Sequence, residues 1–243
     1  MQYSHRPYGA YEKYVKRPLD CILSIGIMLI FGVIALLVKI KLGSPVIFTQ
    51  VRPGLIDKKT GREGLFQLYK FRTMTDERDV DGSLLPDEIR LTKFGKTLRS
   101  TSLDELPELV NVMRGHMALC GPRPQLVRDM LFMTEEQRER HTVRPGLTGL
   151  AQIRGRNAIS WETKLCTDLE YIKKITFLGD LKIILETVGK VFKREGITEE
   201  GMETAADYGD YLLAVGKIDQ EIYDQKQEAA KRLLDLEKSN RRM

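Results

Sequence analysis

The sequence predicts an α-rich α/β protein in three parts, and three observations support this fold class. An uncharged apolar run predicts a membrane-embedded helix at about residues 18–41, within an N-terminal region of residues 1–45. Short strand-like and helical patterns follow one another from residue 46 to residue 201, which is typical of a small α/β domain. A helix-prone, highly charged stretch then predicts a C-terminal helical extension over residues 202–243.

The composition fits one ordinary domain with appendages and argues against several kinds of site. The 243 residues carry a net charge of +5, with 39 Lys and Arg against 34 Asp and Glu. This mild basic balance does not indicate a nucleic-acid partner, and it suits an anionic membrane surface or a phosphate-rich substrate. Cys21, Cys120 and Cys166 lie far apart and the three histidines lack metal-ligand spacing, so neither a disulfide framework nor a zinc site is predicted.

The apolar run from Cys21 to Val38 contains 18 residues without a charge. As a helix it is roughly 27 Å long, against a hydrocarbon core of roughly 30 Å, so it is marginal for crossing a bilayer. Apolar residues occupy nearly every position rather than one stripe. This pattern favours a membrane helix over a buried helix of a soluble protein.

Basic residues flank this run at both ends, namely Lys13, Lys16, Arg17, Lys39, Lys41 and Arg52. The positive-inside rule therefore places both ends on the same side of the membrane. This favours a helix that enters one leaflet, bends and returns, with Gly26 and Gly32 as candidate bend positions because glycine weakens a helix. A helix that spans the bilayer is the alternative, since no proline lies inside the run.

Local patterns predict the elements of the region after residue 45. Strands are predicted at Val46–Gln50 and Leu65–Lys70, with a turn at Arg52–Gly54. Loops rich in Gly and Pro are predicted at Gly121–Pro124 and Arg144–Gly155. Helical patterns are found at Lys93–Leu98, Leu106–Met113, Thr134–Arg140, Thr163–Lys174 and Leu181–Lys193.

The charged stretch over residues 207–242 is predicted to be helical. Apolar side chains recur there every seven residues, at Val215, Ile222, Ala229 and Leu236. Two interpretations stay open. The stretch is either a solvated helix packed on its own domain, or a helix that binds a partner protein or a second copy of the chain.

The stretch RSTSLDELPE, residues 99–108, is the strongest candidate for chemistry. Pro107 fits the first turn of a helix, where its missing N–H is not needed, so a helix start is predicted a few residues earlier. One interpretation is structural. Ser102 and Glu105 match a capping box, and Asp104 could itself be the N-cap.

The other interpretation is catalytic, because Asp104 and Glu105 are adjacent carboxylates surrounded by basic residues. A carboxylate can attack phosphorus and form an acyl phosphate, and a second carboxylate beside it can bind Mg²⁺. Four basic side chains are candidates for holding a diphosphate, namely Lys70, Arg72, Arg99 and Arg123. Arg123 stands in a Gly-Pro-Arg-Pro loop, where two prolines restrict the backbone around it. The sequence contains no P-loop or Rossmann glycine motif.

Together, several motifs resemble the monotopic phosphoglycosyl transferases, also called bacterial sugar transferases, in their small form without a large additional N-terminal membrane domain. The resemblance runs from KRPLD (16–20) to about Gly201, which is roughly four-fifths of the chain. Its other pieces are VIFTQVRPG (46–54), YKFRTM (69–74), RLTKFGKTLRSTSLDELPELVNVMRG (90–115), GPRP (121–124), VRPGLTGLAQIRGRNAISWE (143–162) and DLEY (168–171). The order and spacing of these pieces make the match specific.

The resemblance implies a re-entrant membrane helix that carries a catalytic domain, residues 46–201, on the cytoplasmic face of the bacterial inner membrane. It implies Asp104 as the nucleophile and Glu105 as its partner, both near Mg²⁺. The phosphates would be contacted by Lys70, Arg99 and Arg123, and Asp168 is also implied in substrate binding.

The reaction implied is a two-step transfer of the class that moves substituted phosphate groups. A UDP-sugar gives its sugar phosphate to the aspartate, UMP leaves, and undecaprenyl phosphate, a polyprenyl phosphate, collects the group. This is the first membrane step of bacterial glycoconjugate assembly.

The sequence departs from the family at the membrane helix, which the family usually breaks with Ser-Pro and which here has Gly32-Val33 as the nearest counterpart. Two other functions are considered. A membrane adaptor would use the charged tail but has no purpose for the carboxylate pair. An ordinary glycosyltransferase would release UDP instead of UMP.

Overall fold

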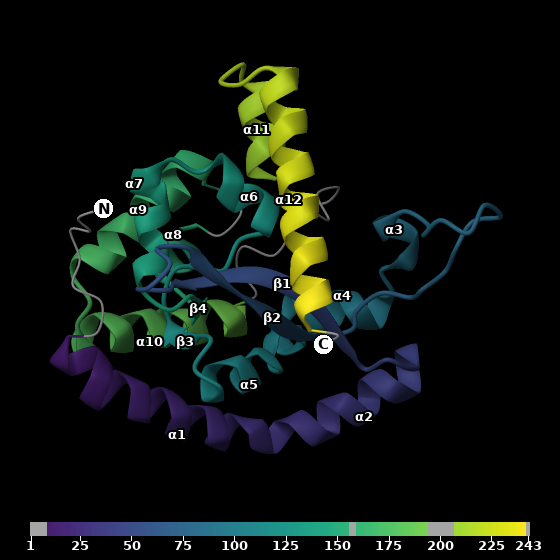
Figure 1. The fold of residues 1–243 in the computed structure, drawn as a ribbon. Helices are drawn as coiled ribbons and strands as arrows, with labels where there is room; N and C mark the ends of the chain where they lie inside the picture. The colour runs from purple at the N-terminus through teal and green to yellow at the C-terminus, as the bar shows by residue number, and fades with distance from the viewer. Residues whose placement is uncertain (1–8, 156–158, 194–206, 242–243) are drawn as a thin grey trace.

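A computed structural model describes residues 9–155, 159–193 and 207–241. The fold is mixed α/β with helices predominating, as the sequence predicts (Figure 1). A β-hairpin and a ring of helices form the body of the molecule. The first two helices curve along one side of this body. The last two helices begin on the opposite side, and the final helix runs from there back across the body toward the first two (Figure 1).

The N-terminal segment is a bent pair of helices. A helical turn at Glu12–Lys16 leads into α1 (Arg17–Ile27), and a single 3-10 turn at Met28–Ile30 separates α1 from α2 (Phe31–Leu42). The bend measures 53°. In the described part of the chain no single helix is long and apolar enough to cross a membrane, whereas this bent pair could do so by length and composition. The bend lies between the two predicted glycines.

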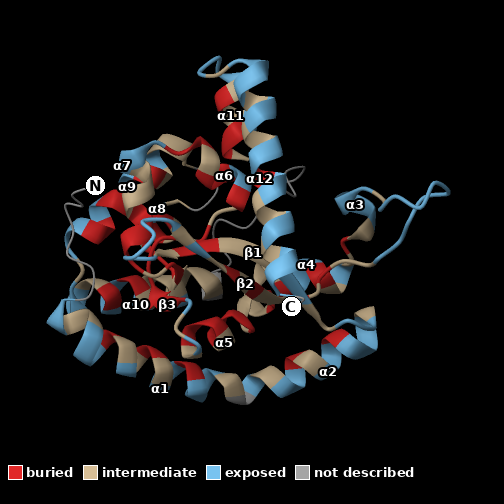
Figure 2. Ribbon diagram, in the orientation of Figure 1, coloured by how far each residue is buried: buried red, intermediate tan, exposed pale blue. Residues whose placement is uncertain are grey.

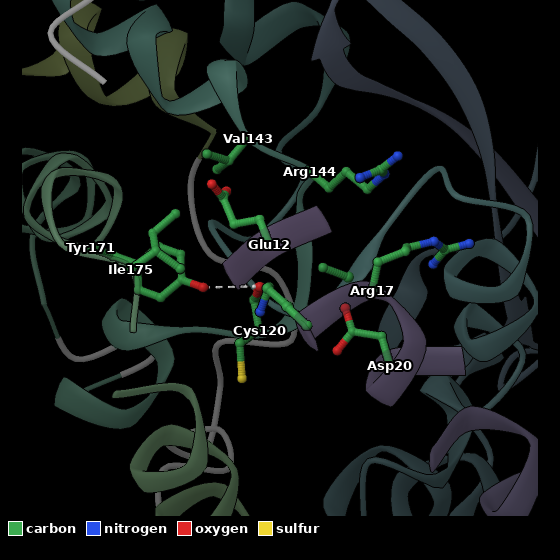
Figure 3. Close-up of a pocket in the computed structure, with 10 residues that line it drawn as sticks. Glu12, Arg17, Asp20, Cys120, Val143, Arg144, Tyr171 and Ile175 are labelled. Carbon is green, nitrogen blue, oxygen red and sulfur yellow. Dashed lines mark hydrogen bonds between the residues drawn. The ribbon is translucent and has the colours of Figure 1, made fainter. Parts of the chain in front are cut away.

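Both halves of the bent pair pack against the same domain. Lys16 pairs with Asp180 at 2.6 Å beside a small pocket, which Figure 3 shows between the N-terminal helix and the domain. The pocket has a volume of about 20 Å³, so it is too small for a substrate. On α2, Val38 packs with Phe71 and Leu98 of the domain. The other side of α1 and α2 exposes apolar side chains (Figure 2).

The two longest strands form an antiparallel hairpin of β1 (Ile47–Ile56) and β2 (Glu63–Phe71). The turn predicted at Arg52–Gly54 is wrong, because these residues continue β1. The pairing register shifts just after Pro53, whose backbone nitrogen has no hydrogen to donate. Arg52, just before this shift, is half-buried and donates to the carbonyl oxygen of Pro124.

A second, parallel pair joins β3 (Ala118–Cys120) to β4 (Gly146–Thr148). The loop predicted at residues 144–155 is therefore partly wrong, because β4 and α8 (Leu150–Arg154) lie within it. Strands of three residues are too short to show an alternating pattern. Gly146 is required here, since a Cβ would lie 2.1 Å from the backbone nitrogen of Gly121.

The remaining helices surround these strands, mostly close to the predicted positions. Thr134 caps one of them in the predicted capping box with Gln137. These helices are α3 (Asp87–Arg90), α4 (Lys93–Ser100), α5 (Glu108–Met113), α6 (Val127–Phe132), α7 (Glu135–Arg138), α9 (Trp161–Lys173) and α10 (Phe177–Lys193), with a 3-10 turn at Glu139–Thr142.

The C-terminal extension consists of α11 (Tyr208–Ala214) and α12 (Gln220–Asn240), which pack on their own domain. The residues of the seven-residue pattern do not form the face that packs on the domain. Val215 ends α11, and the other three positions on α12 are exposed to solvent (Figure 2). The helix α12 instead buries Ala230 and packs Tyr223 against the domain, at positions shifted by one from the pattern. Binding of a partner or second copy stays a prediction.

Candidate active site

A large open cleft of about 1420 Å³, lined on one side by the hairpin, brings the predicted site residues together. Among the described residues that line it, ten are Lys or Arg and seven are Asp or Glu. This excess of positive charge suits a substrate that carries several negative charges. The lining includes every residue predicted from the sequence, namely Lys70, Arg72, Arg99, Asp104, Glu105, Arg123 and Asp168.

Asp104 lies in a short 3-10 turn, Leu103–Glu105, between α4 and α5. The preceding Ser102 has a left-handed backbone, with φ of 55°, and its side chain makes no capping hydrogen bond. Asp104 sits inside the turn rather than at its N-cap. The capping interpretation of both residues is therefore wrong. A non-glycine residue in the left-handed region, two positions before the candidate nucleophile, is a feature common at functional sites.

Glu105 is held between two basic side chains that come from distant parts of the sequence. Lys70 on β2 donates to its Oε1 at 2.8 Å, and Arg123 of the Gly-Pro-Arg-Pro loop donates to the same oxygen at 2.5 Å. Lys70 also pairs with Glu108 at 3.3 Å. Asp104 is buried, yet within the described residues its carboxylate makes no hydrogen bond or ion pair.

The two adjacent carboxylates have opposite pKa shifts. Burial raises the pKa of Asp104 to about 6, and repulsion by Glu105 acts in the same direction. Burial also acts on Glu105, but Arg123 and Lys70 outweigh it and hold the pKa of Glu105 well below its usual range. Asp104 is therefore ionised at neutral pH and more basic than an ordinary carboxylate. Such a group is suited to attack an electrophile.

The other predicted basic residues differ in what their side chains contact. Arg99 on α4 donates to the hydroxyl of Thr73 at 3.1 Å. It also lies close enough to Asp104 for its positive charge to oppose part of the rise in the pKa of Asp104. Arg72 instead pairs with Asp76 at 2.8 Å and donates to backbone carbonyl oxygens. Arg99 is thus nearer to the carboxylates, and the roles of both arginines toward phosphate stay predictions.

Asp168 on α9 lies behind the Arg123 loop. Its Oδ2 accepts hydrogen bonds from Nε and Nη2 of Arg140 at 2.9 and 2.6 Å. The same Nη2 donates to the carbonyl oxygen of Arg123 at 2.6 Å. On the other side, Arg52 donates to the carbonyl oxygen of Pro124 at 3.2 Å. Arg140 and Arg52 therefore hold the backbone of the loop that presents Arg123, and Asp168 in turn holds Arg140.

Arg140 and the residues that continue this network were not predicted from the sequence. His141 contacts Arg140 through Nε2 at 3.3 Å and Glu63 through Nδ1 at 3.2 Å. Arginine can only donate, so Nε2 accepts and Nδ1 carries the proton of a neutral imidazole. No local signal marks these positions. Glu108 was also missed, although it lies three residues after Glu105, a spacing that brings side chains together on a helix.

We expect His141 to make the protein sensitive to acid. Burial lowers the pKa of His141 to about 4. Because the folded pKa is depressed, its stabilising effect is complete above the unfolded value of about 6.5 and is lost as the pH falls toward 4. Between pH 7 and pH 5 the free energy of unfolding should fall by about 2 kcal/mol through this group. In His141→Gln, thermal unfolding should lose this part of its pH dependence. An unchanged slope would contradict the assignment.

Asp104 and Glu105 can bind a divalent cation only if oxygen atoms of the substrate complete its coordination. Within the described residues no group of three or more His, Cys, Asp or Glu side chains is arranged as a metal site. Mg²⁺ is commonly held by one or two carboxylates together with substrate phosphates. Asp104 and Glu105 supply such a donor pair, and the raised pKa of Asp104 marks a negative charge that its surroundings do not fully compensate.

Two adjacent carboxylates in a cleft of excess positive charge are an arrangement suited to chemistry on a negatively charged substrate. The model of the bacterial sugar transferase family matches residues 11–194, and the chain belongs to this family. The predictions of the family and of a transferase are thereby confirmed. The match ends before the C-terminal extension.

Three relatives illustrate the similarity. The sugar transferase EpsL of Bacillus subtilis, described as uncharacterized, is 51% identical over 195 residues, which cover 79% of this chain and 94% of EpsL. The galactosyl transferase CpsE of Streptococcus agalactiae is 36% identical and covers 80% of this chain. The UDP-glucose:undecaprenyl-phosphate glucose-1-phosphate transferase of Escherichia coli is 36% identical and covers 76%. The chain spans 46% of CpsE and 42% of the Escherichia coli enzyme.

Proposed function

We propose that this protein moves a sugar 1-phosphate from a UDP-sugar to undecaprenyl phosphate and releases UMP, as a first membrane step of bacterial glycoconjugate assembly. The observation that carries the proposal is the pair of adjacent carboxylates of Asp104 and Glu105. Asp104 is buried and Glu105 half-buried, and their pKa values shift in opposite directions in a cleft of excess positive charge. The names of several relatives, which include undecaprenyl-phosphate sugar phosphotransferases, support the same substrates.

In the proposed first step, a carboxylate oxygen of Asp104 attacks the phosphorus that bears the sugar. A new oxygen–phosphorus bond forms, the bond to the UMP oxygen breaks, and UMP leaves with the electron pair. In the second step an oxygen of polyprenyl phosphate attacks the same phosphorus, which releases the carboxylate and forms a polyprenyl diphosphate sugar. Arg99 and Arg123 are placed to hold phosphate oxygens, and Lys70 keeps Glu105 ionised and in position.

Asp104 and Glu105 would hold Mg²⁺ together with the diphosphate oxygens, and the ion would neutralise charge on the phosphates. The carboxylates themselves repel a diphosphate, and the bound ion would reduce this repulsion.

We further propose that α1 and α2 form a re-entrant membrane helix, with the cleft at the cytoplasmic face of the inner membrane. Support comes from the 53° bend, from the exposed apolar side chains of the pair, and from the packing of both halves on the same domain. If both ends contact one domain, they lie on one side of the membrane. The basic flanks favour the cytoplasmic side.

The test of this function is to identify the nucleotide product. Purified protein in detergent is incubated with a panel of UDP-sugars, polyprenyl phosphate and Mg²⁺. We expect one UDP-sugar to give UMP and a lipid-linked sugar diphosphate, and we expect EDTA to abolish the release until Mg²⁺ is restored. UDP as the product would instead identify an ordinary glycosyltransferase. Absence of any nucleotide product with every sugar would favour the adaptor, and full activity without metal would exclude the role of Mg²⁺.

A further inference from the structure

The C-terminal extension touches the element that directly follows the Arg123 loop. The match to the family model ends at residue 194, whereas α11 and α12 lie beyond it and pack on α6. Asp129 on α6 accepts one hydrogen bond from the backbone N–H of Leu126 at 3.0 Å and another from that of Tyr208 at 2.9 Å. One carboxylate thus joins the start of α6 to the start of α11.

Other polar contacts fix the extension along α6. Asp207, which precedes α11, forms an ion pair with Arg128. From α12, Lys226 donates to the carbonyl oxygen of Leu131 at 2.5 Å. The extension is therefore attached at both ends of the short helix that carries the chain away from the phosphate-binding loop.

Aromatic packing completes the attachment. The ring of Tyr208 lies 5.0 Å from that of Trp161, measured between centroids, at the start of α9. Gly209 lies directly against Phe132, since a Cβ at this position would come within 2.5 Å of the phenyl ring. The position of α11 is thus set by a contact that leaves no room for even a methyl group.

Several of these contact residues also line the cleft, namely Arg128, Trp161 and Asp207, and with Lys164 they form what we call the extension-side wall. Asp104 lines the same cleft. The ammonium group of Lys164 lies 5.1 Å from the centroid of the Trp161 ring. Burial and the nearby charge of Arg123 lower the pKa of Lys164, so this wall and the Arg123 loop are neighbours. An aromatic ring beside cationic groups is the chemistry that binds a nucleoside phosphate.

The location of the wall favours the nucleotide sugar over the lipid as the substrate that binds to it. In Figure 1 α11 and α6 lie on the side of the molecule opposite the α1–α2 pair. A lipid acceptor arrives from the membrane side, whereas a soluble nucleotide sugar can reach the cleft from the side of the extension.

We propose that the C-terminal extension is a structural part of the donor site: by holding α6 and Trp161, it positions the wall that binds the nucleoside monophosphate half of the donor. The inference rests on the proposed function and assigns a role to a segment outside the matched family region. Asp207 and Tyr208 act here as positioning residues for the wall, not as catalytic residues.

The test uses the full chain, in which Trp161 is the single tryptophan and so reports binding in the cleft by its fluorescence. The probe is UMP, which binds without turnover. In Gly209→Ala the added methyl group should push α11 off Phe132, so the Kd for UMP and the KM for the UDP-sugar should both rise about tenfold. The KM for polyprenyl phosphate should change less than about twofold. Gly189→Ala on α10, where no atom lies within 4 Å of the added Cβ, is the matched control and should behave as wild type.

Lys226→Met provides a second variant, at a position outside the cleft lining: it removes the contact of α12 with the carbonyl oxygen of Leu131 on α6 and keeps the apolar part of the side chain. It should raise the Kd for UMP about threefold and leave the KM for polyprenyl phosphate unchanged. The inference is overturned if wild type binds and releases UMP while the folded variants bind UMP as tightly as wild type does. It is also overturned if the two KM values rise in parallel. A wild type that neither binds nor releases UMP would reject the proposed function itself, and the inference with it.

Discussion

Replacing Asp104 with asparagine should lower kcat by on the order of 10³-fold or more, because an amide is a far poorer nucleophile than a carboxylate. The fold should not suffer. Folding raises the pKa of Asp104 to about 6, so the folded state disfavours its charge at neutral pH. A neutral side chain of the same size removes this cost. We therefore expect a Tm at least as high as that of wild type together with nearly complete loss of turnover.

Mass spectrometry tests the covalent step directly. Wild type incubated with the correct UDP-sugar, without polyprenyl phosphate, should carry a sugar-phosphate adduct on the peptide that contains Asp104. Asp87→Asn is the matched control and should carry the same adduct as wild type, because Asp87 lies on exposed α3 and does not line the cleft. An Asp104→Asn enzyme that stays active, with hydrolysis of the asparagine to aspartate excluded, would overturn the assignment of the nucleophile.

The residues of the candidate site could be predicted from the sequence because they lie in short, recognisable motifs. Lys70, Glu105 and Arg123 come from three separate motifs, and the fold brings them into one set of ion pairs. The capping interpretation failed for a physical reason. A left-handed Ser102 interrupts the helix before α5, and residue types alone do not show that backbone conformation.

The support behind the site could not be predicted in the same way. Arg140, His141 and Glu63 form a buried network only because the 3-10 turn Glu139–Thr142 is packed against the β1–β2 hairpin. Isolated charged residues in a sequence are usually solvated, so nothing local indicates that these are buried. The seven-residue pattern of the tail failed similarly. A break after Val215 and the docking of α12 on α6 select a different face of the helix.

The second large effect concerns stability as well as activity. In Asp168→Asn the guanidinium of Arg140 loses its carboxylate and remains a buried, uncompensated charge. Breaking a buried pair in this way costs about 3–5 kcal/mol, which corresponds to a fall in Tm of roughly 6–20 °C for a protein of this size. Because Arg140 also holds the carbonyl oxygen of Arg123, we expect kcat/KM to fall at least about tenfold in the protein that remains folded.

Glu170→Gln is the matched control, since Glu170 lies on the same helix two residues away and pairs with Arg154 on the exposed surface. Exposed ion pairs contribute little to stability, so this variant should keep the Tm and activity of wild type. The Tm of Asp168→Asn distinguishes a positioning role of Asp168 from direct contact with the substrate. A positioning residue acting through Arg140 lowers both Tm and kcat/KM when it is replaced. An unchanged Tm with lost activity would instead show that Asp168 contacts the substrate and that the loop around Arg123 does not depend on it.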